Sequence, residues 1–211
     1  MTPRPSLTIF AFASLLFTCG CSRPASTILD LDDGDRVVFL GDTLIEQERH
    51  HGWIELMLTT HFPKHNVSFR NLGWSADTPA GDSRFGLSLF QATKGPTDEG
   101  WNQYLKQLES VDPDVVFIAY GMANSFPNSV DATTFEQDYE RLLTALRDIS
   151  PEIRIVLIGP IPHEDLGSPW PNPDTHNVEL RRVNDTVRSI ALRHGLTFVS
   201  LFEPLLETAS S

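Results

Sequence analysis

Residues 36–44 read RVVFLGDTL, an apolar run that ends in glycine, aspartate and threonine. Four later runs have the same character: 67–73 (VSFRNLG), 115–121 (VVFIAYG), 153–160 (IRIVLIGP) and 196–202 (LTFVSLF). Most of them are apolar throughout rather than alternating, which is typical of parallel strands that are covered on both faces. The run at 36–41 and its four counterparts therefore predict a buried parallel sheet.

Segments with helical spacing of apolar residues separate these runs. The clearest lie at 101–108, 135–149 and 180–190, where apolar residues recur every three or four positions. Thr133 and Glu136 predict a capping box at the start of the second helix, and Gly195 predicts the end of the third. Strands that alternate with helices predict an α/β fold, a three-layer doubly wound sandwich around a five-stranded parallel sheet. We expect residues 26–211 to form one domain.

The first 25 residues are predicted to lie outside this domain as a signal segment. Leu7–Phe17 is an apolar run that is shorter than the roughly 20 residues a bilayer span needs and suits the core of a signal peptide. Gly20-Cys21 resembles a bacterial lipobox, while Leu16 fits the spacing to Cys19 better; an ordinary cleaved signal peptide is the alternative. Both interpretations predict an exported protein, periplasmic, in the outer envelope or secreted. With a lipobox, an N-terminal lipid anchor would be its only membrane contact.

The charge and cysteine content exclude several classes of partner and site. With 16 Lys and Arg against 28 Asp and Glu, the net charge is −12, which argues against nucleic-acid binding because that needs a basic face. Cys19 and Cys21 are the only cysteines, so the domain has no disulfide framework or thiolate metal site. No glycine-rich phosphate-binding pattern follows the first strand, so nucleotide binding is the least favoured interpretation.

The predicted strand ends carry glycine together with hydrogen-bonding side chains. They are 41–44 (GDTL), 71–75 (NLGWS), 121–125 (GMANS) and 159–165 (GPIPHED). In such sheets ligands bind beyond the carboxyl ends of the strands. Any one of these segments is explained as an ordinary turn, but four together predict a site at this edge.

These segments resemble the conserved blocks of the SGNH, or GDSL, hydrolases over residues 36–203. The resemblance implies a flavodoxin-like SGNH fold, an esterase without a cofactor, and a small-molecule or carbohydrate ester as its partner. Thr43 stands where the family has its nucleophilic serine, and Asp42 is expected to orient that turn. The amide of Gly73 is implied in the oxyanion hole. Asn124 is implied as the oxyanion donor, one residue beyond the family position.

The family's general base is the main departure. Members supply it from an Asp-x-x-His segment after the last strand, and this sequence contains no such segment. Three explanations stay open: a chain truncated relative to an active relative, a pseudoenzyme that binds a sugar or acyl ligand, and recruitment of another histidine. For the third, His163 or His176 replaces the base for Thr43, and an acidic residue among Glu164, Asp165 and Asp174 orients it.

Several other features receive weaker roles. Ser83 belongs to a second Gly-Asp-Ser triplet, for which a helix start is favoured over a nucleophile. Two histidine pairs, His50-His51 with Glu48 and His61 with His65, are interpreted as surface or helix-end residues rather than metal ligands. Trp74 and Trp170 are expected to line an acyl or sugar pocket. The sequence thus leaves two functions open, an exported esterase and a binding protein with the same pocket.

Overall fold

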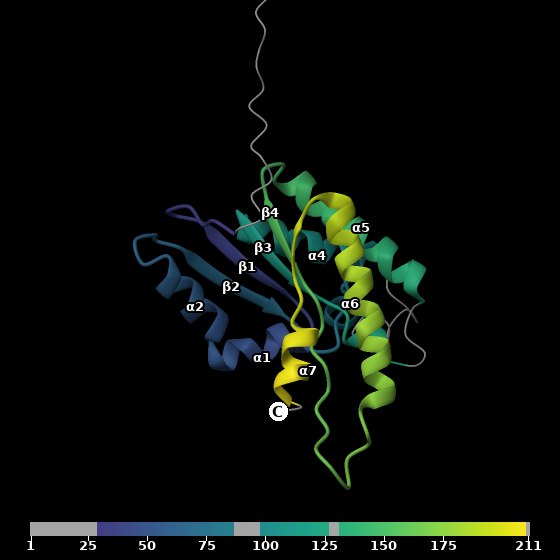
Figure 1. Ribbon diagram of the computed structural model, residues 1–211. Helices are drawn as coiled ribbons and strands as arrows, with labels where there is room; N and C mark the ends of the chain where they lie inside the picture. The colour runs from purple at the N-terminus through teal and green to yellow at the C-terminus, as the bar shows by residue number, and fades with distance from the viewer. Residues whose placement is uncertain (1–28, 87–97, 127–130, 210–211) are drawn as a thin grey trace, which may run out of the picture.

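A computed structural model describes residues 29–86, 98–126 and 131–209 of the chain (Figure 1). The predicted signal segment at residues 1–25, with Cys19 and Cys21, lies outside the described residues. Within them, no helix is both long enough and apolar enough to cross a membrane.

The described residues build a five-stranded sheet in the order β2-β1-β3-β4-β5, and every neighbouring pair is parallel. The strands are β1 (Arg36–Gly41), β2 (Ser68–Gly73), β3 (Val115–Ala119), β4 (Arg154–Ile158) and β5 (Thr197–Val199). The helices are α1 (Thr43–His51), α2 (Trp53–His61), α4 (Asp98–Val111), α5 (Ala132–Ile149), α6 (Asp174–His194) and α7 (Phe202–Ala209), with a π-helical turn η1 (Asp82–Gly86) and a 3-10 turn η2 (Ala123–Ser125). The predicted doubly wound α/β fold is confirmed.

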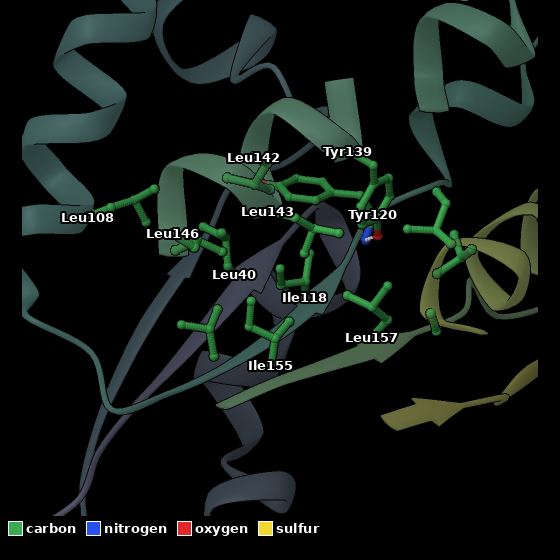
Figure 2. Packing of buried hydrophobic residues seen from close by; sticks show 14 of the residues in the cluster. Leu40, Leu108, Ile118, Tyr120, Tyr139, Leu142, Leu143, Leu146, Ile155 and Leu157 are labelled. Atoms are coloured by element: carbon green, nitrogen blue, oxygen red, sulfur yellow. Dashed lines mark hydrogen bonds between the residues drawn. The ribbon is translucent and has the colours of Figure 1, made fainter. Parts of the chain in front are cut away.

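Helices cover both faces of the sheet, as Figure 1 shows. One cluster packs alternate residues of β1, β3 and β4 against α4, α5 and α6, and a second packs the remaining residues against α1 and α2. Figure 2 shows the first cluster, in which Tyr139, Leu142 and Leu143 of α5 lie over Ile118 and Leu157 of the strands. Covering on both faces explains why the central strands β1, β3 and β4 are apolar apart from Arg36 and Arg154 at the starts of β1 and β4.

The third strand ends two residues earlier than predicted, at the edge of the sheet where the site is expected. β3 stops at Ala119, although the apolar run continues to Gly121. The amide of Tyr120 donates to the hydroxyl oxygen of Tyr139 at 3.4 Å, and the amide of Gly121 donates to the carboxylate of Asp42 at 3.1 Å. Side chains from other elements thus replace the sheet bonds and turn the chain out of the strand.

The two predicted helix ends have different outcomes. Gly195 ends α6 in the left-handed conformation at φ 63°, as predicted. The capping box of Thr133 and Glu136 is wrong, because α5 begins at Ala132 and its cap is Asp131, whose carboxylate accepts from the amide of Thr134 at 2.9 Å. An aspartate ahead of the helix supplies the same kind of acceptor as the predicted threonine, two residues earlier in the chain.

A buried ion pair holds the segment that follows β2. Nε of Arg84 lies 2.7 Å from Asp77, and the side chains are 3% and 0% exposed. Arg84 also donates to the carbonyl of Leu72 at 2.7 Å, at the end of β2. Asp77 accepts in addition from the amide of Ser83 at 3.0 Å. Ser83 lies in η1 and its hydroxyl donates to the carbonyl of Ser75 at 2.9 Å, so its observed contacts are those of a turn.

Candidate active site

Asp42 connects the turns after β1 and β3. The residue is 3% exposed and caps α1. One carboxylate oxygen accepts from the amide of Leu44 at 3.3 Å, and the other accepts from the amides of Gly121 and Met122 at 3.1 and 3.0 Å. Burial raises the pKa of Asp42 to about 6, although the three amides pull it the other way. Asp42 therefore holds both turns at the same edge of the sheet.

Thr43 lies at the first position of α1, and its hydroxyl is engaged by a neighbouring loop. Its Oγ1 accepts a hydrogen bond from the amide of Ala76 at 3.2 Å. Across the three described ranges, which include all seven histidines, no histidine is hydrogen-bonded to Thr43. The position of Thr43 just before Leu44 would also suit a helix cap, but that role belongs to Asp42.

The amide of Gly73 is also engaged within the protein. It donates to the side-chain oxygen of Asn71 at 2.9 Å, and the Asn71 amide group donates in turn to the carbonyl of Ile45 at 2.7 Å. A Cβ on Gly73 would lie 2.3 Å from the backbone nitrogen of Glu46. Glycine is required here because β2 and α1 approach each other more closely than any side chain permits.

The turn after β3 faces a cavity of about 900 Å³. Asn124 and Ser125 of η2 line it, together with the first turn of α5, the part of α6 from Thr175 to Thr186 and the loop between β4 and α6. Further lining residues include aromatic or apolar side chains (Phe126, Phe135, Leu166, Trp170, Pro171, Val183), charged ones (Asp131, Glu164, Glu179, Arg182) and neutral polar ones (Asn172, Thr175, Thr186). Trp170 lines this cavity as expected of a pocket residue, and it is 62% exposed. Trp74 is 48% exposed and is not among the residues that line it.

His163 and His176 meet on the wall of this cavity. Their rings stack with centroids 4.7 Å apart and planes 30° apart, and the ring centroid of Phe126 lies 4.3 Å from that of His176 with the two planes at 67°. The side chain of Asn177 holds the backbone of His163 through two hydrogen bonds. The backbone amide of His163 donates to Oδ1 of Asn177 at 2.8 Å, and Nδ2 of Asn177 donates to the backbone carbonyl of His163 at 2.9 Å. Among the residues that the structure describes, the buried Nε2 of His163 has no hydrogen-bond partner.

A serine to which the sequence patterns assign no role contacts the second imidazole. Ser125 is 6% exposed, and its Oγ lies 2.7 Å from Nε2 of His176. The same Oγ lies 2.7 Å from the carbonyl oxygen of Met122. Burial lowers the pKa of His176, the neighbouring His163 lowers it further and Glu179 opposes them, so the net effect favours the neutral ring. The sequence signals for this pair are separate: Ser125 lies in the strand-end segment 121–125, and His176 is a candidate base in the segment after β4.

The structure brings together one part of the predicted site and separates another. Asn124 and His163 line one cavity, and Asp42 is bonded to the turn that leads to Asn124. Thr43 lies just after β1 and Gly73 at the end of β2, and neither is among the residues that line this cavity. Thr43 is hydrogen-bonded to the amide of Ala76, and the amide of Gly73 to the side chain of Asn71. No cluster of three or more potential metal ligands occurs in the described part of the chain. A catalytic role for Thr43, Gly73, Asn124, Asp42 and His163 stays a prediction.

Comparison with protein families identifies the fold's lineage. The family model of the GDSL-like lipase/acylhydrolases matches residues 39–211. The chain belongs to this family. The predicted resemblance to the SGNH hydrolases is thereby confirmed. No curated protein matches the sequence at a significant level.

Solved structures of family-like enzymes share the fold at low sequence identity. Axe2, an acetylxylan esterase from Geobacillus stearothermophilus, is 16% identical over 87% of this chain and 83% of its own, with a TM-score of 0.61. BT4096, a gut microbial diltiazem-metabolizing enzyme, is 23% identical, with a TM-score of 0.61. The match covers 87% of this chain but only 40% of BT4096. LAE5, an α/β hydrolase enzyme from the metagenome of Lake Arreo in Spain, is 14% identical over 85% of this chain and 83% of its own, with a TM-score of 0.60. At these identities the likeness shows the fold.

Proposed function

We propose that this family member is an ester hydrolase that holds an acylated substrate in the cavity beside η2. The observation that carries the proposal is the cavity of about 900 Å³, because it lies at the carboxyl edge of the sheet where this fold class binds ligands. Its wall combines aromatic surface with a serine–histidine contact, which are the groups that binding and acyl transfer need.

The chemistry of the cavity favours a neutral acyl ester, such as an acylated carbohydrate. Trp170 and Phe126 offer ring faces and edges for packing against a sugar or a short acyl group. Asp131, Glu164 and Glu179 stand against the single arginine of the lining, Arg182, and the whole chain carries a net charge of −12. Such a field disfavours an anionic ester. The fold is also that of an acetylxylan esterase.

The family motif supplies one assignment of roles within this proposal. Thr43 acts as the nucleophile, the amide of Gly73 and the side chain of Asn124 hold the oxyanion, His163 serves as base and Asp42 orients the turn. What supports it is position, since Thr43 directly follows β1 and Asp42 ties that turn to η2. The contacts of Ala76 with Thr43 and of Asn71 with Gly73 must break for it to operate.

Those same two hydrogen bonds favour a second candidate, a protein that binds the ester without hydrolysing it. A threonine hydroxyl that accepts an amide proton, without a base beside it, is a poor nucleophile. In this case the cavity would hold a sugar or acyl ligand in a pseudoenzyme.

A pair of adjacent substitutions distinguishes these candidates. Ala132 lines the cavity at the start of α5, and Thr133 is the exposed neighbour that does not. Release of p-nitrophenol from p-nitrophenyl acetate and of acetate from acetylated xylo-oligosaccharides is measured for the wild type, Ala132→Trp and Thr133→Trp. Hydrolysis that Ala132→Trp alone abolishes supports the esterase. No hydrolysis, with a ligand-induced rise in Tm that Ala132→Trp alone abolishes, supports the binding protein.

We also propose that the protein works outside the cytoplasm, attached to the envelope through Cys21 or released after cleavage. The apolar run Leu7–Phe17 followed by Gly20-Cys21 supports this location. Fractionation of cells that express the wild type and Cys21→Ala tests it, since loss of membrane association in the variant indicates a lipid anchor. Cytoplasmic recovery of the wild type would contradict export.

A further inference from the structure

The contact between Ser125 and His176 lies on a different turn from the family's nucleophile position. Thr43 follows β1, whereas Ser125 ends η2 after β3. Oγ of Ser125 and Nε2 of His176 are 2.7 Å apart, within the range at which a base takes a hydroxyl proton. Both residues line the cavity, so an acyl carbonyl held there would meet the serine hydroxyl.

We propose that Ser125 is the nucleophile and His176 the general base of an acyl-transfer site in this cavity. The inference rests on the proposed function, because it assumes that the ester occupies this cavity. It replaces Thr43 and His163 in those two roles and leaves the family fold as the frame.

The surroundings of His176 suit a base. The residue lies in the first turn of α6, and its ring is stacked on His163 and packed against Phe126. Burial and the neighbouring His163 lower its pKa and favour the unprotonated ring, while Glu179 acts in the opposite sense and favours the imidazolium that forms during the reaction. The amino-terminal end of α6 borders the same cavity, and its partial positive charge favours a developing oxyanion.

A second hydrogen bond at Ser125 sets the condition under which the pair reacts. The serine has one hydroxyl proton and two partners at 2.7 Å, the carbonyl of Met122 and Nε2 of His176. When His176 carries its proton on Nδ1, Nε2 is free to accept from Ser125; when the proton is on Nε2, the ring donates and Ser125 donates to Met122. The Nδ1-protonated tautomer is the reactive one.

Ser110 makes the same kind of backbone hydrogen bond as Ser125 but has no histidine contact among the hydrogen bonds of the described residues. Its Oγ donates to the carbonyl of Gln107, three residues earlier, at 2.8 Å, just as Ser125 reaches Met122. Ser110 lies at the end of α4, ahead of β3 and hence at the opposite edge of the sheet from η2. It is therefore a matched internal control for serine reactivity.

The proposed reaction balances with water as the only co-reactant. Oγ of Ser125 attacks the acyl carbon while its proton moves to Nε2 of His176; the bond from the acyl carbon to the alcohol oxygen then breaks, and the alcohol leaves with that proton. Water attacks the acyl-serine, gives one proton to Nε2 of His176, and releases the carboxylic acid as the proton returns to Oγ of Ser125.

Phosphonylation by a fluorophosphonate probe tests the nucleophile directly. The probe's phosphorus forms a bond to the attacking oxygen and loses fluoride, so the label stays on that residue. Trypsin separates the candidates, because Ser125 lies in the peptide 107–141 and Thr43 in the peptide 37–49. The full chain is labelled as wild type, His176→Gln and His194→Gln, with fragmentation spectra to locate the label. His194 is the matched control, since it lies at the far end of α6 and pairs with Glu140 at 2.5 Å.

The expected result is a label on Ser125, none on Ser110, and a labelling rate that falls at least about 100-fold in His176→Gln but not in His194→Gln. A label on Thr43, equal rates in the two variants, or no label overturns the inference. Ester hydrolysis measured on the same samples separates the two proposals: hydrolysis with the label on Thr43 leaves the esterase standing, whereas a labelled Ser125 without hydrolysis supports the pair and contradicts the esterase.

Discussion

The turns after β1 and β3 are neighbours in the sheet, and each presents a hydroxyl, but their surroundings differ. Thr43 accepts a backbone amide proton from Ala76, whereas Ser125 contacts a histidine on the wall of a cavity. The first turn matches the family motif, and the second has the partners that acyl transfer requires. Motif position thus identifies the lineage of this chain, while the groups around each hydroxyl decide its chemistry.

The largest effect that we expect is the loss of hydrolysis on removing one of the two hydroxyls, that of Ser125 or that of Thr43. We expect Ser125→Ala to lower kcat/KM for p-nitrophenyl acetate by at least about 1,000-fold, because the substitution removes the attacking oxygen. Thr43→Ala should have a smaller effect, since it removes a contact of the loop at Ala76. Steady-state kinetics of both variants provide the measurement. A larger loss in Thr43→Ala would reverse the comparison and favour the family assignment.

The next effect concerns Asp42, the residue that joins the two turns. We expect Asp42→Ala to lower the free energy of unfolding by about 3 kcal/mol or more, because it removes a helix cap and leaves two amides of the β3 turn without their acceptor. Asp131→Ala removes only the cap of α5 and should cost about 1 kcal/mol. Urea denaturation checks both. Equal losses would mean that Asp42 acts as a cap alone.

The titration of Asp42 gives a pH-dependent version of the same test. Its pKa in the folded protein, about 6, lies above the unfolded value near 4. Between these values the folded protein binds more protons, so this group's contribution to stability is present at about pH 4 and is lost as the pH rises through 6. A shift of two units corresponds to about 3 kcal/mol.

We therefore expect the stability of the wild type relative to Asp42→Asn to fall between pH 4 and pH 7. Asp114 supplies a control of opposite sign, because the hydrogen bonds from Arg36 lower its pKa. Relative to Asp114→Asn, the wild type should lose stability as the pH falls. Because the Asp114 contribution is lost only below the unfolded pKa near 4, denaturation curves from about pH 2 to pH 7 provide the data. A wild-type advantage over Asp42→Asn that does not vary with pH would show that the carboxylate titrates normally.

The smallest expected effect concerns the stacked imidazoles. The rate of hydrolysis should require neutral His176 and rise with pH through a value below 6.5, since burial and His163 lower its pKa. His163→Gln removes one of these causes, so the acid limb of the rate profile should move to higher pH. If His163 were itself the base, the substitution would abolish the reaction rather than shift its pH dependence.

Local sequence patterns are sufficient to predict the sheet and most of its edge. Burial on both faces makes β1, β3 and β4 apolar apart from Arg36 and Arg154, and glycine with aspartate marks the turn at Asp42. The position of His163 and His176 in the segment that follows β4 also indicates, from chain order alone, that both belong near this edge.

The contacts that give these residues their chemistry are not predictable in the same way. Ser125 and His176 are 51 positions apart, and their contact depends on the path of the loop between β4 and α6. The bond from Gly121 to Asp42 spans 79 positions, and it turns the chain out of β3 earlier than the apolar run suggests. Periodicity and motif spacing report on neighbours along the chain, whereas these contacts arise from tertiary packing.

The reactivity of the Ser125–His176 pair is tested most directly by the hydrolysis of p-nitrophenyl acetate by two variants at opposite ends of α6. His176→Gln removes the imidazole that contacts Ser125, and His194→Gln removes one that pairs with Glu140 away from the cavity. We expect a loss of at least about 100-fold in kcat/KM for His176→Gln and a wild-type rate for His194→Gln. Wild-type hydrolysis by His176→Gln would contradict the assignment of the pair.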